Sequence, residues 1–244
     1  MATTLSEPVG LIDCKTAALV PLTGVEVDAE IAGRSSRVKI SQKFCNREKV
    51  PVEAVYKFPL TEAASICGFR ARVGEKVIEG NIEEREKAFE KYDEALEAGH
   101  GGYLLDEERP NIFTLSVGNL NPGAEAVLEI EYVTLLETHG REVRFSLPTT
   151  ISPRYLPADA PDEDGIPAAA KVNPEFELDV PYGLRVQLRV HGRDGIESVE
   201  SPSHSIKQSF GEDTLEIGLT AEEGKLDRDF VVNVHYREAF QNRA

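Results

Sequence analysis

The chain has 244 residues, of which 41% are hydrophobic and 29% charged, so it can bury a substantial core and is not a disordered tail. Its 43 acidic and 27 basic residues give a formal charge of -16. That charge opposes the contacts by which Lys and Arg bind phosphates, and it argues against nucleic acid and anionic membranes as partners. No apolar run approaches the roughly 20 residues of a membrane-spanning helix.

The start of the chain and its cysteines bear on localisation. The first residues have neither the basic start nor the apolar stretch of a signal peptide. Cys14, Cys45 and Cys67 form an odd set without C-x-x-C spacing, which indicates a reducing compartment and favours buried, structural thiols. We therefore expect a soluble, cytoplasmic protein that does not insert into membranes.

Residues 19–79 alternate between apolar and polar side chains, as in Val38, Ile40 and Phe44. This period of two is typical of strands. The segments FRARV and KVIEG, on either side of residues 74–75, predict a hairpin. Pro51 and Pro59 mark strand ends, because proline cannot donate a hydrogen bond within a sheet.

The period changes in residues 82–98, which predict one long helix with an apolar stripe. Asn81 can cap its start, and Gly99 stands where a left-handed C-cap belongs. We expect this helix to pack against a β-sheet through one face, formed by Ile82, Phe89, Tyr92 and Leu96.

Strands resume at residues 112–117 and 126–136, joined by a turn at Asn121, Pro122 and Gly123. Another strand follows at residues 143–147. The acidic, proline-containing residues 158–171 predict an exposed linker, and four more alternating segments lie beyond it. The expected fold is mainly β, built of antiparallel β-sandwich modules with one long helix at about 82–98.

A search for catalytic, metal and cofactor sites finds no convincing set of residues. Gly99, His100, Gly101 and Gly102 resemble the oxyanion loop of a hydrolase, but no G-x-S-x-G string accompanies them. His204, within SPSHS, is the other histidine that could act as a base, although such a string is also ordinary turn chemistry. The histidines and acidic residues lack zinc and EF-hand spacing. We expect no catalytic site, no metal and no cofactor, with a hydrolase using His100 or His204 as the alternative.

Several motifs occur in a characteristic order: IEGNI, FEKYDEALEAGHGGYLL, the strand start at residues 111–113, VGNLNPGAEAVLEIEY and FSLPTTISPRYLP. Together with the strands before them, they resemble the VIT (vault protein inter-alpha-trypsin) domain of proteins that also carry a von Willebrand type A domain. Inter-alpha-trypsin inhibitor heavy chains are related to these proteins. The resemblance implies a VIT domain at residues 1–157, the linker at 158–171, and a second β module at 172–244 that precedes a type A domain.

The resemblance also implies which residues matter and how. The structural motif residues are Gly80, Tyr92, Gly99, Phe113, Gly118, Asn119, Pro122, Gly123, Tyr132, Pro153, Arg154, Tyr155, Asp227, Asp229 and Phe230. The VIT module is not catalytic in this family, so we expect a non-enzymatic interaction and scaffold module.

Its expected partners are an unidentified protein and a downstream type A domain of the same natural chain. That domain carries the metal motif D-x-S-x-S. The nearest string in this chain is DGIES at residues 194–198, which does not match the motif, so we expect the type A domain itself to be absent from these residues. Tyr236 and Phe240 are expected to lie on the exposed surface that the type A domain covers.

Overall fold

A computed structural model describes residues 10–16, 19–60, 63–74, 76–80, 105–109, 112–147, 184–220 and 228–239. These residues form strands β1 to β16 and one 3₁₀ turn, η2, at Arg193–Gly195. The mainly β fold is therefore confirmed. The helix predicted for residues 82–98, including Phe89, lies outside the described residues and stays a prediction.

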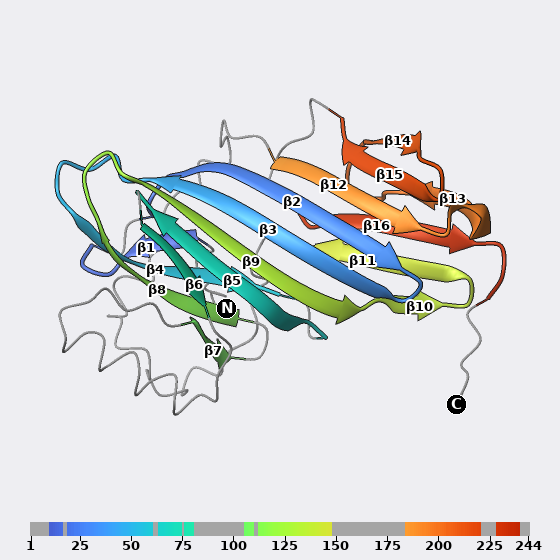
Figure 1. The fold of residues 1–244 in the computed structure, drawn as a ribbon, viewed down its shortest axis with the longest axis horizontal. Helices are drawn as coiled ribbons and strands as arrows, with labels where there is room; N and C mark the ends of the chain where they lie inside the picture. The colour runs from blue at the N-terminus through green and yellow to red at the C-terminus, as the bar shows by residue number, and fades with distance from the viewer. Residues whose placement is uncertain are drawn as a thin grey trace, which may run out of the picture.

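The largest sheet has eight strands, in the order β14-β15-β12-β2-β3-β9-β5-β6 (Figure 1). Its strands, in that order, are Ile206–Phe210, Thr214–Leu219, Leu184–His191, Leu22–Ala32, Ser35–Cys45, Glu125–Leu135, Ser65–Val73 and Lys76–Gly80. The predicted hairpin is confirmed, because β5 and β6 pair antiparallel on either side of Gly74.

Two smaller sheets of four strands lie behind the large one, near its two ends (Figure 1). The first has the order β1-β4-β8-β7, with strands Gly10–Asp13, Val52–Pro59, Ile112–Leu120 and Leu105–Arg109. The second has the order β10-β11-β16-β13, with strands Glu137–His139, Glu142–Leu147, Phe230–Tyr236 and Ile196–Glu200.

Alternation along each strand separates a buried face of the large sheet from an exposed one. On β2, Val25, Val27, Ala29 and Ile31 are buried, whereas the residues between them are exposed or half-buried. The buried residues of all three sheets form one apolar core. Between the large sheet and the first small sheet, Phe44 meets Tyr56 edge to face at 5.6 Å. The small sheets thus cover the buried face and leave the outer face open.

Strands from both sides of the predicted linker share two of the sheets. β12 pairs with β2 over seven residues, Leu184 to Val190, and β16 pairs antiparallel with β11. The described parts of the two predicted modules are therefore joined by backbone hydrogen bonds. The β12–β2 pair is parallel, so the expectation of purely antiparallel sheets is wrong at this point. Alternation reveals a strand but not its direction or its neighbour.

Candidate functional site

The outer face of the eight-stranded sheet carries rows of charge whose sign alternates from strand to strand. β2 presents acidic side chains, β9 presents Glu129 and Glu131, and the strands between and beside them present basic ones. The remaining members of these rows are Arg185, Arg189 and His191 on β12, Glu26, Asp28 and Glu30 on β2, Arg37, Lys39 and Lys43 on β3, and Arg70 and Arg72 on β5. Opposite charges on adjacent strands attract, so this alternation favours one strand order over others.

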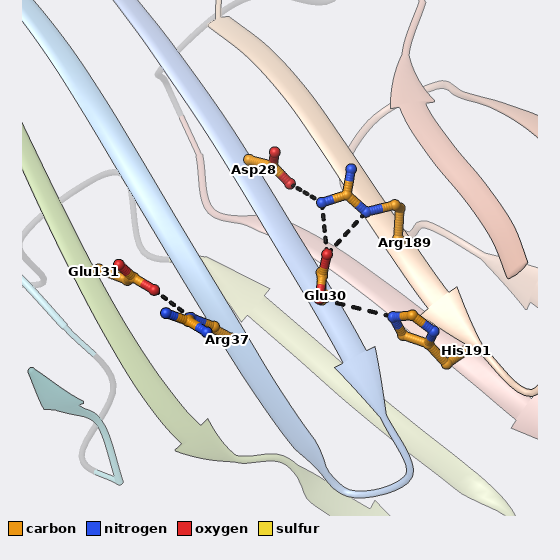
Figure 2. A network of polar contacts seen from close by, with 6 residues as sticks. All are labelled: Asp28, Glu30, Arg37, Glu131, Arg189 and His191. Atoms are coloured by element: carbon orange, nitrogen blue, oxygen red, sulfur yellow. Dashed lines mark hydrogen bonds and ion pairs between the residues drawn. The ribbon is translucent and has the colours of Figure 1, made fainter. Parts of the chain in front are cut away.

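Arg189 makes the most extensive set of contacts on this face (Figure 2). Its Nη2 lies 2.9 Å from Oδ1 of Asp28 and 2.7 Å from Oε1 of Glu30, and its Nε donates to the same Glu30 oxygen at 3.1 Å. The other oxygen of Glu30 lies 3.8 Å from Nε2 of His191. The Arg189 side chain is 28% exposed, so its ion pairs are less screened than those of fully exposed groups. Arg189 therefore links β12 to β2 through side chains as well as through the backbone.

Ion pairs continue across the other strands of the outer face. Arg37 donates to Glu131 (Figure 2), and Nζ of Lys39 lies 3.1 Å from Glu129. Arg70 bridges Glu79 at 2.7 Å and Glu129 at 3.6 Å. Most of these side chains are well exposed, so each pair is worth only about 0–1 kcal/mol. The rows therefore contribute more to strand order and specificity than to stability.

The outer row of β9 becomes apolar where the strand ends. Glu129 and Glu131 are followed on the same face by Val133 and Leu135, which are 42% and 66% exposed. Their cross-strand partners on β3 are Arg37 and Ser35. Exposed apolar side chains bordered by charges are typical of protein–protein contact surfaces.

His204 is not placed to act as a catalytic base. It is 5% exposed, its Nδ1 lies 2.9 Å from Oγ of Ser203, and its ring lies 5.6 Å from that of Phe230. Ser203 Oγ also accepts a hydrogen bond from the Val231 N–H at 2.9 Å, which ties the SPSHS turn to β16. In this position the histidine packs against Phe230 and holds the turn, and its burial does not support the alternative role for His204. His100 lies outside the described residues.

Tyr236 does not lie on an exposed interaction surface. Its side chain is 9% exposed and belongs to the apolar core, and burial raises the pKa of its hydroxyl. The expectation for Tyr236 is therefore wrong, because its position on β16 points it inward with Phe230, Val232 and Val234. Phe240 lies outside the described residues.

Several structural motif residues have clear positions. Pro122 and Gly123 form the predicted turn, in which Gly123 has φ 73° and the Ala124 N–H donates to Asn121 O at 3.0 Å. This turn joins β8 and β9, which belong to different sheets. Gly118 and Asn119 lie at a register shift between β8 and β4. The backbone of Phe113 pairs with Phe58, and Gly80 ends β6 opposite Phe69.

The other motif residues divide into two groups. Tyr132 and Phe230 are fully buried, and Asp229 comes directly before β16. The remaining motif residues lie outside the described residues; they are Tyr92, Gly99, Pro153, Arg154, Tyr155 and Asp227.

Asn46 is a structural residue that the sequence analysis missed. It is 1% exposed, and its side-chain amide donates to Val50 O at 3.0 Å and Leu120 O at 2.8 Å, while its Oδ1 accepts from the Glu48 N–H at 2.8 Å. Its backbone C=O accepts from Gly123 N–H at 2.8 Å. Asn46 therefore holds the turn between β8 and β9. An asparagine just after an alternating strand is a weak signal of this role.

The cysteines are more exposed than expected. Cys14 and Cys67 are exposed and Cys45 is half-buried, and all three are free thiols. Partial burial of the Cys14 thiol, with the nearby carboxylates of Glu53 and Asp13, raises its pKa. Partial burial and Glu131 likewise raise the pKa of Cys67. Raised pKa values disfavour the reactive thiolate.

No metal site or membrane-spanning helix is visible in the described ranges. Their His, Cys, Asp and Glu side chains include no group of three or more that could hold a metal ion. Within the same ranges, no helix has the length and apolar character that crossing a membrane requires.

Comparisons with known proteins point to one family. Residues 22–132 match the family model of the vault protein inter-alpha-trypsin domain. The chain is 32% identical over 225 residues to mouse protein mono-ADP-ribosyltransferase PARP4, covering 92% of this chain but 11% of that protein. It is 33% identical over 225 residues to rat von Willebrand factor A domain-containing protein 5A, covering 90% of this chain and 27% of the relative. The chain thus spans only a small part of these relatives.

Solved structures give a weaker likeness. An M1 zinc metallopeptidase from Deinococcus radiodurans matches with a TM-score of 0.46 and 9% identity, over 94% of this chain and 43% of that one. A likeness of this size carries no information about activity.

Proposed function

Because residues 22–132 belong to the vault protein inter-alpha-trypsin (VIT) domain family, we propose that the chain is a non-enzymatic protein-interaction module. It acts as a scaffold together with a von Willebrand type A domain of the same natural protein. The similarity to von Willebrand factor A domain-containing protein 5A, over 90% of this chain, supports that partner.

The observation that carries the proposal is the apolar end of the outer sheet face. Val133 and Leu135 remain 42% and 66% exposed at the end of β9, whereas the two outward residues before them, Glu131 and Glu129, are charged and paired. A folded partner that covers these two side chains removes apolar surface from water, worth about 25 cal/mol per Å² before ordering costs. The surrounding ion pairs form the polar rim that protein interfaces have around such a centre.

The environment of His204 supports a non-enzymatic role. A general base has to come within hydrogen-bond reach of its substrate, and His204 is enclosed between Ser203 and Phe230. The contacts with Ser203 and Phe230 give the His204 side chain a structural role in the core.

A binding titration tests the proposal. The type A domain of the natural protein is expressed separately and titrated into residues 1–244, with the dissociation constant measured by calorimetry. We expect saturable binding that Leu135→Arg weakens at least about tenfold, equivalent to about 1.4 kcal/mol. The control is Phe210→Arg, because Phe210 is equally exposed, at 68%, on the distant edge strand β14. Absence of binding, or equal weakening by both variants, would contradict the proposal.

A further inference from the structure

Arg72 breaks the pattern of paired charges on the outer face. The other outward basic side chains of β12, β3 and β5 each lie within 4.0 Å of a carboxylate on a neighbouring strand. The cross-strand neighbours of Arg72 are instead Val127 on β9 and Val77 on β6. Among the residues that the structure describes, no carboxylate pairs with its guanidinium.

Arg72 lines a hollow in the surface. The lining of this hollow consists of Arg70, Arg72, Val77, Val127 and Glu129, which come from strands β5, β6 and β9. Val77 is 57% exposed and Val127 is buried, and Arg72 lies between them on β5. Arg70 and Glu129 pair with each other at 3.6 Å, so among the described lining residues Arg72 is the one charge without a described ion pair.

The hollow lies beside β6, which is an edge strand of the large sheet among the described strands. β6 is the last strand in the order and pairs only with β5 among the described strands. In an antiparallel pair, every second residue directs its N–H and C=O away from its partner, so an edge strand offers a row of unused hydrogen-bonding groups. The backbone of β6 can therefore accept an additional strand.

We propose that the β6 edge binds an extended acidic segment of a partner protein as an added strand. A carboxylate of that segment pairs with Arg72, and an apolar side chain beside it covers Val77. Main-chain hydrogen bonds to β6 supply affinity, while the paired charge and the apolar contact select the sequence. This inference is independent of the proposed type A partner, because the hollow lies near Val127 and the apolar patch lies at Val133 and Leu135, the other end of β9.

The acidic character of the whole chain does not prevent this contact. Although the formal charge is -16, charges more than about 8 Å apart are largely screened at physiological ionic strength. The local environment of Arg72 decides the preference, and its nearest cross-strand neighbours are uncharged. Binding should consequently show little long-range attraction and a strong dependence on Arg72 itself.

Two short synthetic peptides test this inference. One repeats Val-Thr-Asp-Thr, so that valine and aspartate lie on the same face of the added strand, and the other has lysine in place of aspartate. Binding to residues 1–244 is measured by calorimetry and by the amide NMR shifts of β6. We expect the aspartate peptide to bind and to shift the amides of Val77 and Glu79, while the lysine peptide does not bind. Arg72→Glu should weaken binding of the aspartate peptide at least about tenfold and should allow the lysine peptide to bind.

Arg185→Glu is the matched control. It changes the net charge equally and alters another outward arginine, which is 81% exposed on β12, so it should leave peptide binding unchanged. Val77→Asp is a second variant, expected to pair with Arg72 and compete with the peptide. Failure of the aspartate peptide to bind, equal binding of both peptides, or amide shifts on β14 in place of β6 would overturn the inference. None of these results would affect titration with the type A domain.

Discussion

Arg189 and Glu30 lie 159 positions apart in the sequence, and both Nη2 and Nε of Arg189 donate to Oε1 of Glu30, at 2.7 and 3.1 Å. The two residues are direct register partners in the parallel pair of β12 and β2. A slip by one residue would turn Arg189 toward the core, because successive side chains on a strand point to opposite faces. The ion pair and the apolar alternation therefore specify the same register.

Replacing Arg189 by Met should lower the free energy of unfolding by about 1 kcal/mol, because the pair is partly shielded and doubly hydrogen-bonded. Urea unfolding measures this change, and a double-mutant cycle with Glu30→Gln isolates the pair. Arg185→Met is the control, with an expected change below about 0.5 kcal/mol, since that side chain is 81% exposed and its Nη1 lies 4.0 Å from the Glu26 carboxylate. Equal effects of the two substitutions would contradict this interpretation.

Asn46→Ala should be more damaging, at about 2–3 kcal/mol, because it leaves the buried carbonyl group of Leu120 without its donor and also removes the bond to the Val50 carbonyl. The loss is measured by urea unfolding. Asn121→Ala, in the adjacent turn but with an exposed side chain, should change stability by less than about 0.5 kcal/mol. If Asn46→Ala is as mild as this control, the amide does not hold the turn.

Phe230→Ala tests the core under the second small sheet. The ring is fully buried and lies 6.3 Å from that of Phe145, so its removal should cost about 3–5 kcal/mol in thermal or urea unfolding. Phe210→Ala provides the contrast, because that ring is 68% exposed and contacts only the Arg193 guanidinium at 5.1 Å among its described ring contacts. A change above about 1 kcal/mol for Phe210→Ala would contradict the predicted contrast between the two rings.

Asp13 should make stability depend on pH in the acid range. Burial opposes its ionisation, but hydrogen bonds from the Thr16 hydroxyl and the Lys15 N–H outweigh this effect and hold its pKa below the ordinary 3.8. A pKa depressed by folding adds stability above the unfolded value, and that stability is lost as the pH falls through the folded pKa. Asp13→Asn should therefore be less stable than the parent at neutral pH, and the difference should shrink below pH 3.8. A constant difference from neutral to acid pH would contradict this assignment.

The sequence predicted the strands well because a half-buried strand has a period of two. Val25, Val27 and Val38 lie on the buried face as their alternation indicates, and the turn at Pro122 and Gly123 has the expected backbone. The charges between them were visible too, but their alternation from strand to strand becomes apparent only when the strand order is known. That order depends on long-range pairing, which a local pattern does not encode.

Tyr236 was misplaced because its hydroxyl suggests an exposed role, yet its position on β16 encloses the side chain in the core. His204 is buried in the SPSHS segment, for which turn chemistry was the other interpretation of the sequence. Arg72 and Asn46 were missed for the opposite reason, because each is ordinary in sequence and gains its significance from neighbours on other strands.

The central claim, that the chain is an interaction module for a type A domain, is tested most directly by hydrogen–deuterium exchange. The natural protein containing that domain is compared with residues 1–244 alone. The account predicts slower exchange at the end of β9 around Val133 and Leu135, and on the adjoining part of β3, when the domain is present. Identical exchange in these strands with and without the domain would contradict the claim.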